Sequence, residues 1–376
     1  MFYTTIPLVF LFLLCLNATA PLTLENTFII MNINNGSRRF AMKLNYEQIK
    51  AVTSGAESVR KEENEYRFFR FNDREIAFYK SSPFYTKVYA TSDVEMCFET
   101  DATALSIKGN AHVAVSYRLW YVLEVFVNGE RIGTIQNFDG EMNKEKLFAE
   151  FELGEFSGCF ELGEGKKNVR IVFPQFAALA LSEVDLIGGS YASPVKPKKK
   201  MFFYGDSITH GYDAQYPSNK YTARTARALG VEGYNKAIGG EVFQPGLAAA
   251  KSDLEPDYIS VAYGTNDCGT DRETFLKNSH AFYENLSKNY PNAKIFALSP
   301  IWRANYADKQ TVGDFFDVEK QIKKISEEIP NIVFVPGFDF VPHDTKYFYD
   351  GHLHPSDEGF EFYAKNLVKA IKKHFD

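Results

Sequence analysis

The spacing of apolar residues changes its period at residues 193–200, and no other feature of this sequence constrains the fold as strongly. Before this segment, short runs alternate apolar and polar residues or are rich in β-branched ones, which is typical of strands. After it, apolar runs of strand length alternate with stretches of helical period. The segment itself, SPVKPKKK, contains two prolines and four lysines, which favour a stiff, hydrated linker. The 376 residues are therefore expected to form two folded units.

The first unit, residues 21–192, is predicted to be an antiparallel, jelly-roll-like β-sandwich. Asn128-Gly129 separates two of its strand-like runs and favours a tight hairpin, because both residues tolerate positive φ. A helix is expected near residues 45–52. The strand-like runs are PFYTKVYA, EMCFET, ALSIKG, HVAVSY, YVLEVFVNGERIGTIQ, KNVRIVF and SEVDLI.

The second unit, residues 201–376, alternates predicted strands with predicted helices. Such alternation predicts a parallel sheet with helices on both faces, an α/β fold. Ligands bind such sheets outside the carboxyl ends of the strands. The expected strands are 201–204, 233–238, 257–263, 293–299 and 331–335, and the expected helices lie near 219–229, 272–289, 313–328 and 357–373.

Small and polar residues follow four of these strands, as an active site built from loops requires. They are Gly205-Asp206-Ser207, Gly239-Gly240, Gly264-Thr265-Asn266-Asp267 and Ser299-Pro300-Ile301-Trp302. Trp302 is interpreted either as a pocket wall for an acyl group or a sugar, or as a core residue.

Taken alone, Ser207 is more typical of the N-cap of a helix than of a nucleophile. A serine nucleophile also needs a base and donors for the oxyanion that forms. Asn266 and the backbone N–H of Gly240 can supply the donors, and YDGHLHPSDEG supplies histidines and Asp350 just before the last helix. The combination favours a nucleophilic Ser207.

These four blocks, GDS, IGG, GTND and DGHLHP, resemble those of the SGNH (GDSL-type) hydrolases, in the same order along residues 200–376. The resemblance implies a flavodoxin-like three-layer α/β/α domain. It assigns Ser207 as nucleophile, His354 as general base, and the N–H groups of Ser207 and Gly240 with the Asn266 side chain as the oxyanion hole. It implies no metal and no organic cofactor.

The sequence departs from that family where the acid is expected, three residues before the base. Gly351 occupies this place, and Asp350 stands four residues before His354. Three hypotheses remain: Asp350 still orients His354, a Ser-His dyad operates without an acid, or His352 is the base.

Three further residues near these blocks receive local interpretations. Asp206 is expected to shape the turn or to contribute to the substrate pocket, and Asp267 to hold the Asn266 loop through backbone N–H groups. His210 is expected at the surface, with a pocket-lining role as the alternative.

A β-sandwich ahead of such a domain also resembles certain acetyl-carbohydrate esterases. The chain is therefore predicted to be a serine esterase that removes short acyl groups, acetyl above all, from a small-molecule or polysaccharide ester. A lipase or thioesterase is the alternative within this fold, and a non-catalytic carbohydrate-binding protein is the alternative outside it.

Charge and the N-terminal sequence bear on partners and location. The net charge of −6, with no basic stripe beyond residues 196–200, argues against nucleic-acid binding. Residues 1–20 resemble a signal peptide and therefore predict secretion. Their apolar run is too short for a stable membrane span. The alternative is that they form a buried first strand or helix of a cytoplasmic protein. Cys97 and Cys159 either pair or remain thiols.

Overall fold

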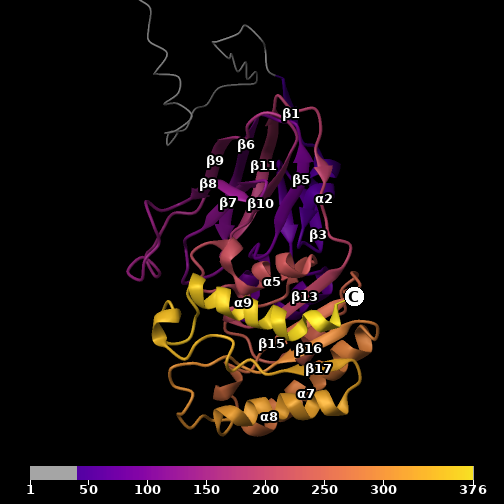
Figure 1. The fold of residues 1–376 in the computed structure, drawn as a ribbon, viewed down its shortest axis with the longest axis vertical. Helices are drawn as coiled ribbons and strands as arrows, with labels where there is room; N and C mark the ends of the chain where they lie inside the picture. Colours follow the sequence, from indigo (N-terminus) through magenta and orange to yellow (C-terminus); the bar gives the residue numbers. More distant parts are fainter. Residues whose placement is uncertain (1–39, 376) are drawn as a thin grey trace, which may run out of the picture.

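The computed structural model describes residues 40–375, which form a β-sandwich and an α/β unit stacked on one another (Figure 1). The predicted signal peptide, residues 1–20, and the start of the predicted sandwich, residues 21–39, lie outside the described residues. Within residues 40–375, no helix has the length and apolar character that crossing a membrane requires.

The sandwich consists of two six-stranded sheets in which every strand pairs antiparallel with its neighbours, as predicted. In the first sheet the order is β3-β4-β11-β6-β9, with β1 also paired to β11; in the second it is β12-β5-β10-β7-β8, with β2 also paired to β5. The strands are β1 Ala41–Lys43, β2 Thr53–Ser54, β3 Ser58–Glu62, β4 Glu65–Phe69, β5 Glu95–Thr100, β6 Ala104–Val113, β7 Val122–Val127, β8 Glu130–Gln136, β9 Glu155–Glu161, β10 Lys167–Val172, β11 Ala177–Ile187 and β12 Ser193–Pro194.

Two local predictions for the sandwich are confirmed. Asn128 and Gly129 connect β7 to β8 with φ values of 51° and 90°, the left-handed backbone that a two-residue hairpin turn requires. The helix expected near residues 45–52 is α2, Tyr46–Val52, and Asn45 caps it by accepting from the Gln48 amide. Cys97, on β5, is a free thiol, so no Cys97–Cys159 disulfide forms.

The prediction of a strand over PFYTKVYA is wrong. This segment forms the 3₁₀ helix η1, Tyr85–Tyr89, and helix α3, Asp73–Tyr79, precedes it. Phe71, Tyr79 and Val88 are buried against the sheet of the α/β unit rather than in the sandwich core. Tertiary packing therefore overrides the β-propensity of this stretch.

The α/β unit is built on a parallel sheet with the strand order β14-β13-β15-β16-β17. In chain order this is 2-1-3-4-5, the flavodoxin-like arrangement, so the expected fold class is confirmed. The strands are β13 Lys200–Gly205, β14 Glu232–Asn235, β15 Tyr258–Ala262, β16 Lys294–Leu298 and β17 Ile332–Val335.

Helices cover both faces of this sheet. Helices α5 and α9 lie on one side of the sheet, and α7 and α8 lie on the other (Figure 1). The side chain of Phe203 packs with residues of α5 and α9, whereas that of its neighbour Phe202 packs with residues of α7 and α8. The helices are α4 Ser207–His210, α5 Tyr221–Leu229, α6 Pro245–Ala249, α7 Arg272–Asn289, α8 Phe315–Glu328 and α9 Asp357–Ile371, with short 3₁₀ turns η2 Pro217–Asn219, η3 Asp267–Gly269, η4 Thr345–Tyr347 and η5 Lys372–His374.

Buried ion pairs join the two units. The Lys236 ammonium, wholly buried after β14, lies 2.6 Å from Glu57 and 2.7 Å from Glu75, both from the N-terminal half. Lys220 pairs with Asp93 at 2.9 Å in the same way. Because a buried charge is costly without its partner, these pairs hold the two units in one arrangement.

Candidate active site

Ser207 lies where β13 ends and α4 begins. The N-cap of α4 is Asp206, whose Oδ1 accepts from the Ile208 amide at 3.0 Å, and Ser207 is the first helical residue. Its amide therefore has no partner within the helix. The capping role considered for Ser207 belongs to Asp206, which leaves the Ser207 hydroxyl available for another contact.

That hydroxyl contacts a histidine from the far end of the chain. Ser207 Oγ lies 2.8 Å from His354 Nε2, and His354 Nδ1 lies 2.9 Å from Asp350 Oδ2. His354 stands in the loop before α9, and this histidine, not His352, faces Ser207. The contact requires the fold, because 147 positions separate the two residues.

The loop of residues 348–355 accommodates the additional residue between Asp350 and His354. Gly351 has φ of 74°, a left-handed conformation that glycine adopts without strain, and Phe348 pairs with Pro355 across the loop. Asp350 Oδ1 accepts from the backbone amides of residues 352, 353 and 354. Asp350 thus both shapes the loop and reaches the imidazole.

Partial burial opposes ionisation of Asp350, but the hydrogen bond and charge of His354, with the loop amides, outweigh it. The net effect holds the pKa of Asp350 below its ordinary value. At neutral pH the imidazole therefore faces a carboxylate, which favours the tautomer with its proton on Nδ1 and a free lone pair on Nε2.

The predicted oxyanion donors follow the two strands on either side of β13. Gly240, after β14, has φ of 91°, and its amide donates to no other described residue. Asn266, after β15, donates to the Glu241 carbonyl at 2.9 Å and keeps a second amide hydrogen. Asp267 accepts from the Phe243 and Gly264 amides, in agreement with the loop-holding role predicted for it.

Two other residues singled out in the sequence are buried. Asp206 is almost fully buried, which raises its pKa to about 6, and its side chain caps α4, in agreement with the turn-shaping role predicted for it. Trp302 is only 8% exposed and packs against His343 and Phe348, which favours the core alternative.

The expectation that His210 lies at the surface is wrong, because its side chain is fully buried between the two units. Its Nε2 lies 2.8 Å from the Gln175 carbonyl, and its Nδ1 accepts from the Gly239 amide at 3.3 Å. His210 therefore connects the sandwich to the loop that carries Gly240. A single histidine in a sequence does not reveal such a contact.

Sequence reasoning also missed three charged residues at the site: Asp213 and Arg118 near His354, and Lys87 at the loop of Gly240. Asp213 Oδ2 lies 3.5 Å from His354 Nδ1, and Arg118, from the loop between β6 and β7, binds Asp213 Oδ1 at 2.9 Å. Lys87 of η1 donates to the Gly239 carbonyl at 2.6 Å. Asp213 follows Ser207 closely in the sequence, but nothing in the sequence places Arg118 or Lys87 near it.

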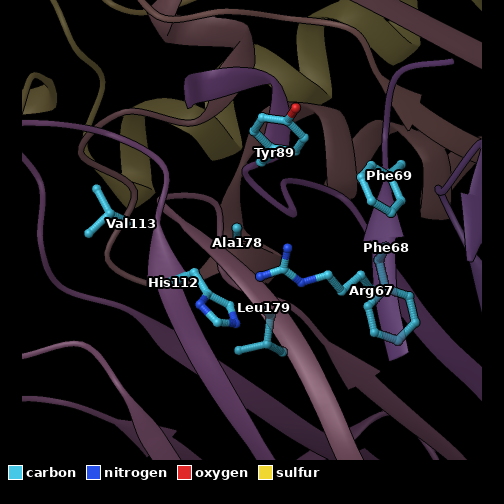
Figure 2. A pocket seen from close by; sticks show the side chains of 8 residues that line it. All are labelled: Arg67, Phe68, Phe69, Tyr89, His112, Val113, Ala178 and Leu179. Atoms are coloured by element: carbon cyan, nitrogen blue, oxygen red, sulfur yellow. The ribbon is translucent and has the colours of Figure 1, made fainter. Parts of the chain in front are cut away.

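A separate cavity of about 140 Å³ lies in the sandwich (Figure 2). It opens beside the β4–β11 pairing, which links Arg67 with Ala180 and Tyr66 with Leu181. None of the predicted site residues lines it; the lining residues are Arg67, Phe68, Phe69, Tyr89, His112, Val113, Ala178 and Leu179.

Several solved structures share this architecture. A salicylyl-acyltransferase, SsfX3, from a tetracycline biosynthetic pathway superposes with a TM-score of 0.74 at 21% identity, over 89% of this chain and 97% of that one. A putative GDSL-like lipase from Bacteroides ovatus gives 0.69 at 18% identity, over 89% and 98%. A family two carbohydrate esterase from Clostridium thermocellum, in complex with cellohexaose, gives 0.59 at 18% identity, over 76% and 93%.

At these identities the likenesses establish the two-unit fold. No curated protein matches the sequence. The model of the GDSL-like Lipase/Acylhydrolase family matches residues 203–362, a range that begins within β13 and ends within α9. The α/β unit of this chain is therefore a GDSL-like lipase/acylhydrolase domain, and the protein is a serine hydrolase of the esterase class.

Proposed function

We propose that this protein hydrolyses short acyl esters, acetyl esters above all, of a carbohydrate or a related alcohol. Ser207 is the nucleophile, His354 the general base and Asp350 the acid that orients it. The observation that carries the proposal is the unbroken series of contacts at 2.8 Å and 2.9 Å from Ser207 Oγ through His354 to Asp350. This is the arrangement that nucleophilic catalysis by serine requires.

In the first half of the reaction, Ser207 Oγ forms a bond to the ester carbonyl carbon as its proton passes to His354 Nε2. The carbonyl oxygen becomes an oxyanion, and the amides of Ser207 and Gly240 with the Asn266 side chain donate to it. The protonated imidazole, stabilised by Asp350, then gives its proton to the leaving alcohol as the ester C–O bond breaks. The product is an acyl-serine.

In the second half, water takes the place of the alcohol. His354 removes a proton from the water as its oxygen attacks the acyl carbon, and the same donors hold the second oxyanion. Collapse of this intermediate returns the proton to Ser207 Oγ and releases the carboxylic acid. Each half begins and ends with neutral His354, so one histidine serves both.

The substrate class rests on two supports. Carbohydrate esterases are among the proteins that share the two-unit fold, one of them bound to cellohexaose. In addition, a Cβ atom at Gly240 would lie 3.3 Å from the Phe84 ring, so the N-terminal half closes over the Gly240 loop. This close cover favours a small acyl group over a long chain.

The test is hydrolysis of p-nitrophenyl acetate, butyrate and octanoate, and of a peracetylated sugar, by wild type and by Ser207→Ala. We expect wild type to prefer acetate and the alanine variant to lose at least about 10³-fold in kcat. Ser218→Ala, a matched control, removes a buried hydroxyl that donates to Glu124. Equal rates for wild type and Ser207→Ala would refute the proposal, and a preference for octanoate would make the protein a lipase.

A further inference from the structure

A second carboxylate lies beside the proposed base, and a residue of the other unit holds it there. Asp213 is fully buried, and its Oδ1 lies 2.9 Å from both Nε and Nη2 of Arg118. Its Oδ2 has no hydrogen-bond partner among the described residues and lies 3.5 Å from His354 Nδ1. A buried carboxylate oxygen without a donor is costly, so its direction toward the imidazole calls for an explanation.

The local backbone also shows that Asp213 is held in an unusual position. Its φ of 68° lies in the left-handed region, which residues other than glycine seldom adopt and which is common at functional sites. Asp213 follows α4, the helix that begins with Ser207, so the nucleophile and this carboxylate share one short segment.

Arg118 comes from the sandwich and is itself buried. It donates to the Tyr117 carbonyl, and the Phe148 ring covers the guanidinium at 4.1 Å. Pairing with this fixed cation compensates the burial of the Asp213 carboxylate. Without the sandwich, the buried Asp213 carboxylate would lose this cation.

We propose that Asp213, held by Arg118 of the sandwich, is a positioning residue that shares His354 Nδ1 with Asp350 and stabilises the protonated imidazole during catalysis. Asp350 is partly exposed and Asp213 is not, so one carboxylate orients the ring from the solvent side and the other from the interior. The inference rests on the proposed esterase function and adds that the sandwich completes the catalytic unit.

Several groups surround His354 and enter the interpretation of its pH dependence. Asp350 belongs to its own loop, Asp213 and the Tyr212 ring follow α4, and Ser207 faces Nε2. Asp206 interacts with it through charge, and Arg118 lies behind Asp213. Among these, Asp213 and Asp350 are the two carboxylates at Nδ1.

The experiment compares Asp213→Asn, Asp350→Asn and the double variant, each with p-nitrophenyl acetate from pH 4.5 to 9. Asparagine tolerates the left-handed backbone at position 213, so the single variant is expected to fold. We expect about a 10-fold loss in kcat/KM. The acidic limb of its pH profile should also move to lower pH, because the protonated imidazole loses a neighbouring negative charge. The double variant should lose more than the product of the two single losses, because either carboxylate partly replaces the other.

Glu124→Gln is the matched control, since Glu124 is also a buried carboxylate that pairs with an arginine and binds the other unit through Ser218. The acidic limb of the pH profile of Glu124→Gln should lie at the same pH as that of wild type. Arg118→Met should reproduce the loss in kcat/KM of Asp213→Asn, because the carboxylate is then no longer held in place, and Arg118→Lys should restore part of it. All assays are run with and without a chelator, because Asp213, Asp350 and His354 offer ligand atoms within 4.8 Å of one another.

An acidic limb that stays in place in Asp213→Asn, with additive losses in the double variant, would overturn the inference while leaving the esterase function intact. Loss of wild-type activity on chelation would also overturn it, in favour of a metal at these three residues. The function itself fails only if Ser207→Ala is as active as wild type.

Discussion

At the scale of single residues, the two aspartates nearest Ser207 and Asn266 in the sequence serve the backbone. Asp206 caps α4, and Asp267 accepts from two amides that hold the loops after β14 and β15. Burial is the largest influence on both, and it raises their pKa values to about 6 and about 7. The sequence motifs place both residues near the site. Their burial depends on the surrounding fold, so the motifs alone do not reveal it.

Replacing Asp267 with asparagine should change how stability depends on pH. The folded-state pKa of about 7 exceeds the unfolded value of about 3.9, so the unfolded chain releases this proton first. The contribution of Asp267 to the free energy of unfolding is therefore complete below about pH 4 and is lost as pH rises to about 7. Between these two pH values the free energy of unfolding falls by at most about 1.4 kcal/mol per pH unit because of this group. Urea unfolding from pH 4 to 8 should give a flatter profile for Asp267→Asn than for wild type.

Asp271→Asn is the control for that measurement. Asp271 is an exposed N-cap of α7, and the amide of Thr274 holds its pKa below the ordinary value. Its stabilising contribution is present above about pH 4 and is lost below it, so this variant should leave the slope between pH 4 and 7 unchanged. An unchanged slope in Asp267→Asn as well would contradict the assignment.

At the scale of elements, the site is assembled from strand ends. The loops after β13, β14 and β15 carry Ser207, Gly240 and Asn266, and these three strands are neighbours in the sheet. The alternation of strands and helices predicts this edge, because carboxyl ends of parallel strands meet there. The conformation of the loop around Gly351, which lets Asp350 reach His354, depends on contacts such as the Phe348–Pro355 pairing.

Gly240→Ala should lower kcat by about 10²-fold with little change in KM, because one oxyanion donor is displaced. The added Cβ would lie 3.3 Å from the Phe84 ring, and φ of 91° strains any residue but glycine. Steady-state kinetics on p-nitrophenyl acetate measure the effect.

Gly230→Ala provides the comparison, since Gly230 also has positive φ, at the end of α5, and a Cβ there meets no atom within 4 Å. This variant should lose stability while keeping kcat. Equal kcat values for the two variants would contradict the role of the Gly240 amide as an oxyanion donor.

At the scale of the whole molecule, the two units share a core and a buried charge network. Phe71, Tyr79 and Val88 of the N-terminal half pack in the core of the α/β unit, and Lys236 of the α/β unit is buried between Glu57 and Glu75. The linker prediction describes only how the chain connects the units. Because the two units share this core and these ion pairs, we expect them to unfold together.

Calorimetry of the full chain should therefore give one cooperative transition, and Lys236→Met should lower its midpoint without dividing it. Removing the ammonium leaves two buried carboxylates without their cation, which typically costs about 3–5 kcal/mol. Lys251→Met removes an exposed ammonium paired with Glu255 and should change the midpoint little. Two separate transitions in wild type would contradict the shared core.

The amino-acid sequence by itself determined the change of period at residues 193–200, the parallel sheet and the residues that gather at its edge, because hydrophobic period and strand-end chemistry are local properties. It left open whether Asp350 or any acid reaches the base. The tertiary structure decided that question, together with the burial of His210 and Trp302 and the approach of Arg118 and Asp213 to His354. These outcomes depend on which distant segments pack together, and local periodicity carries no record of such contacts.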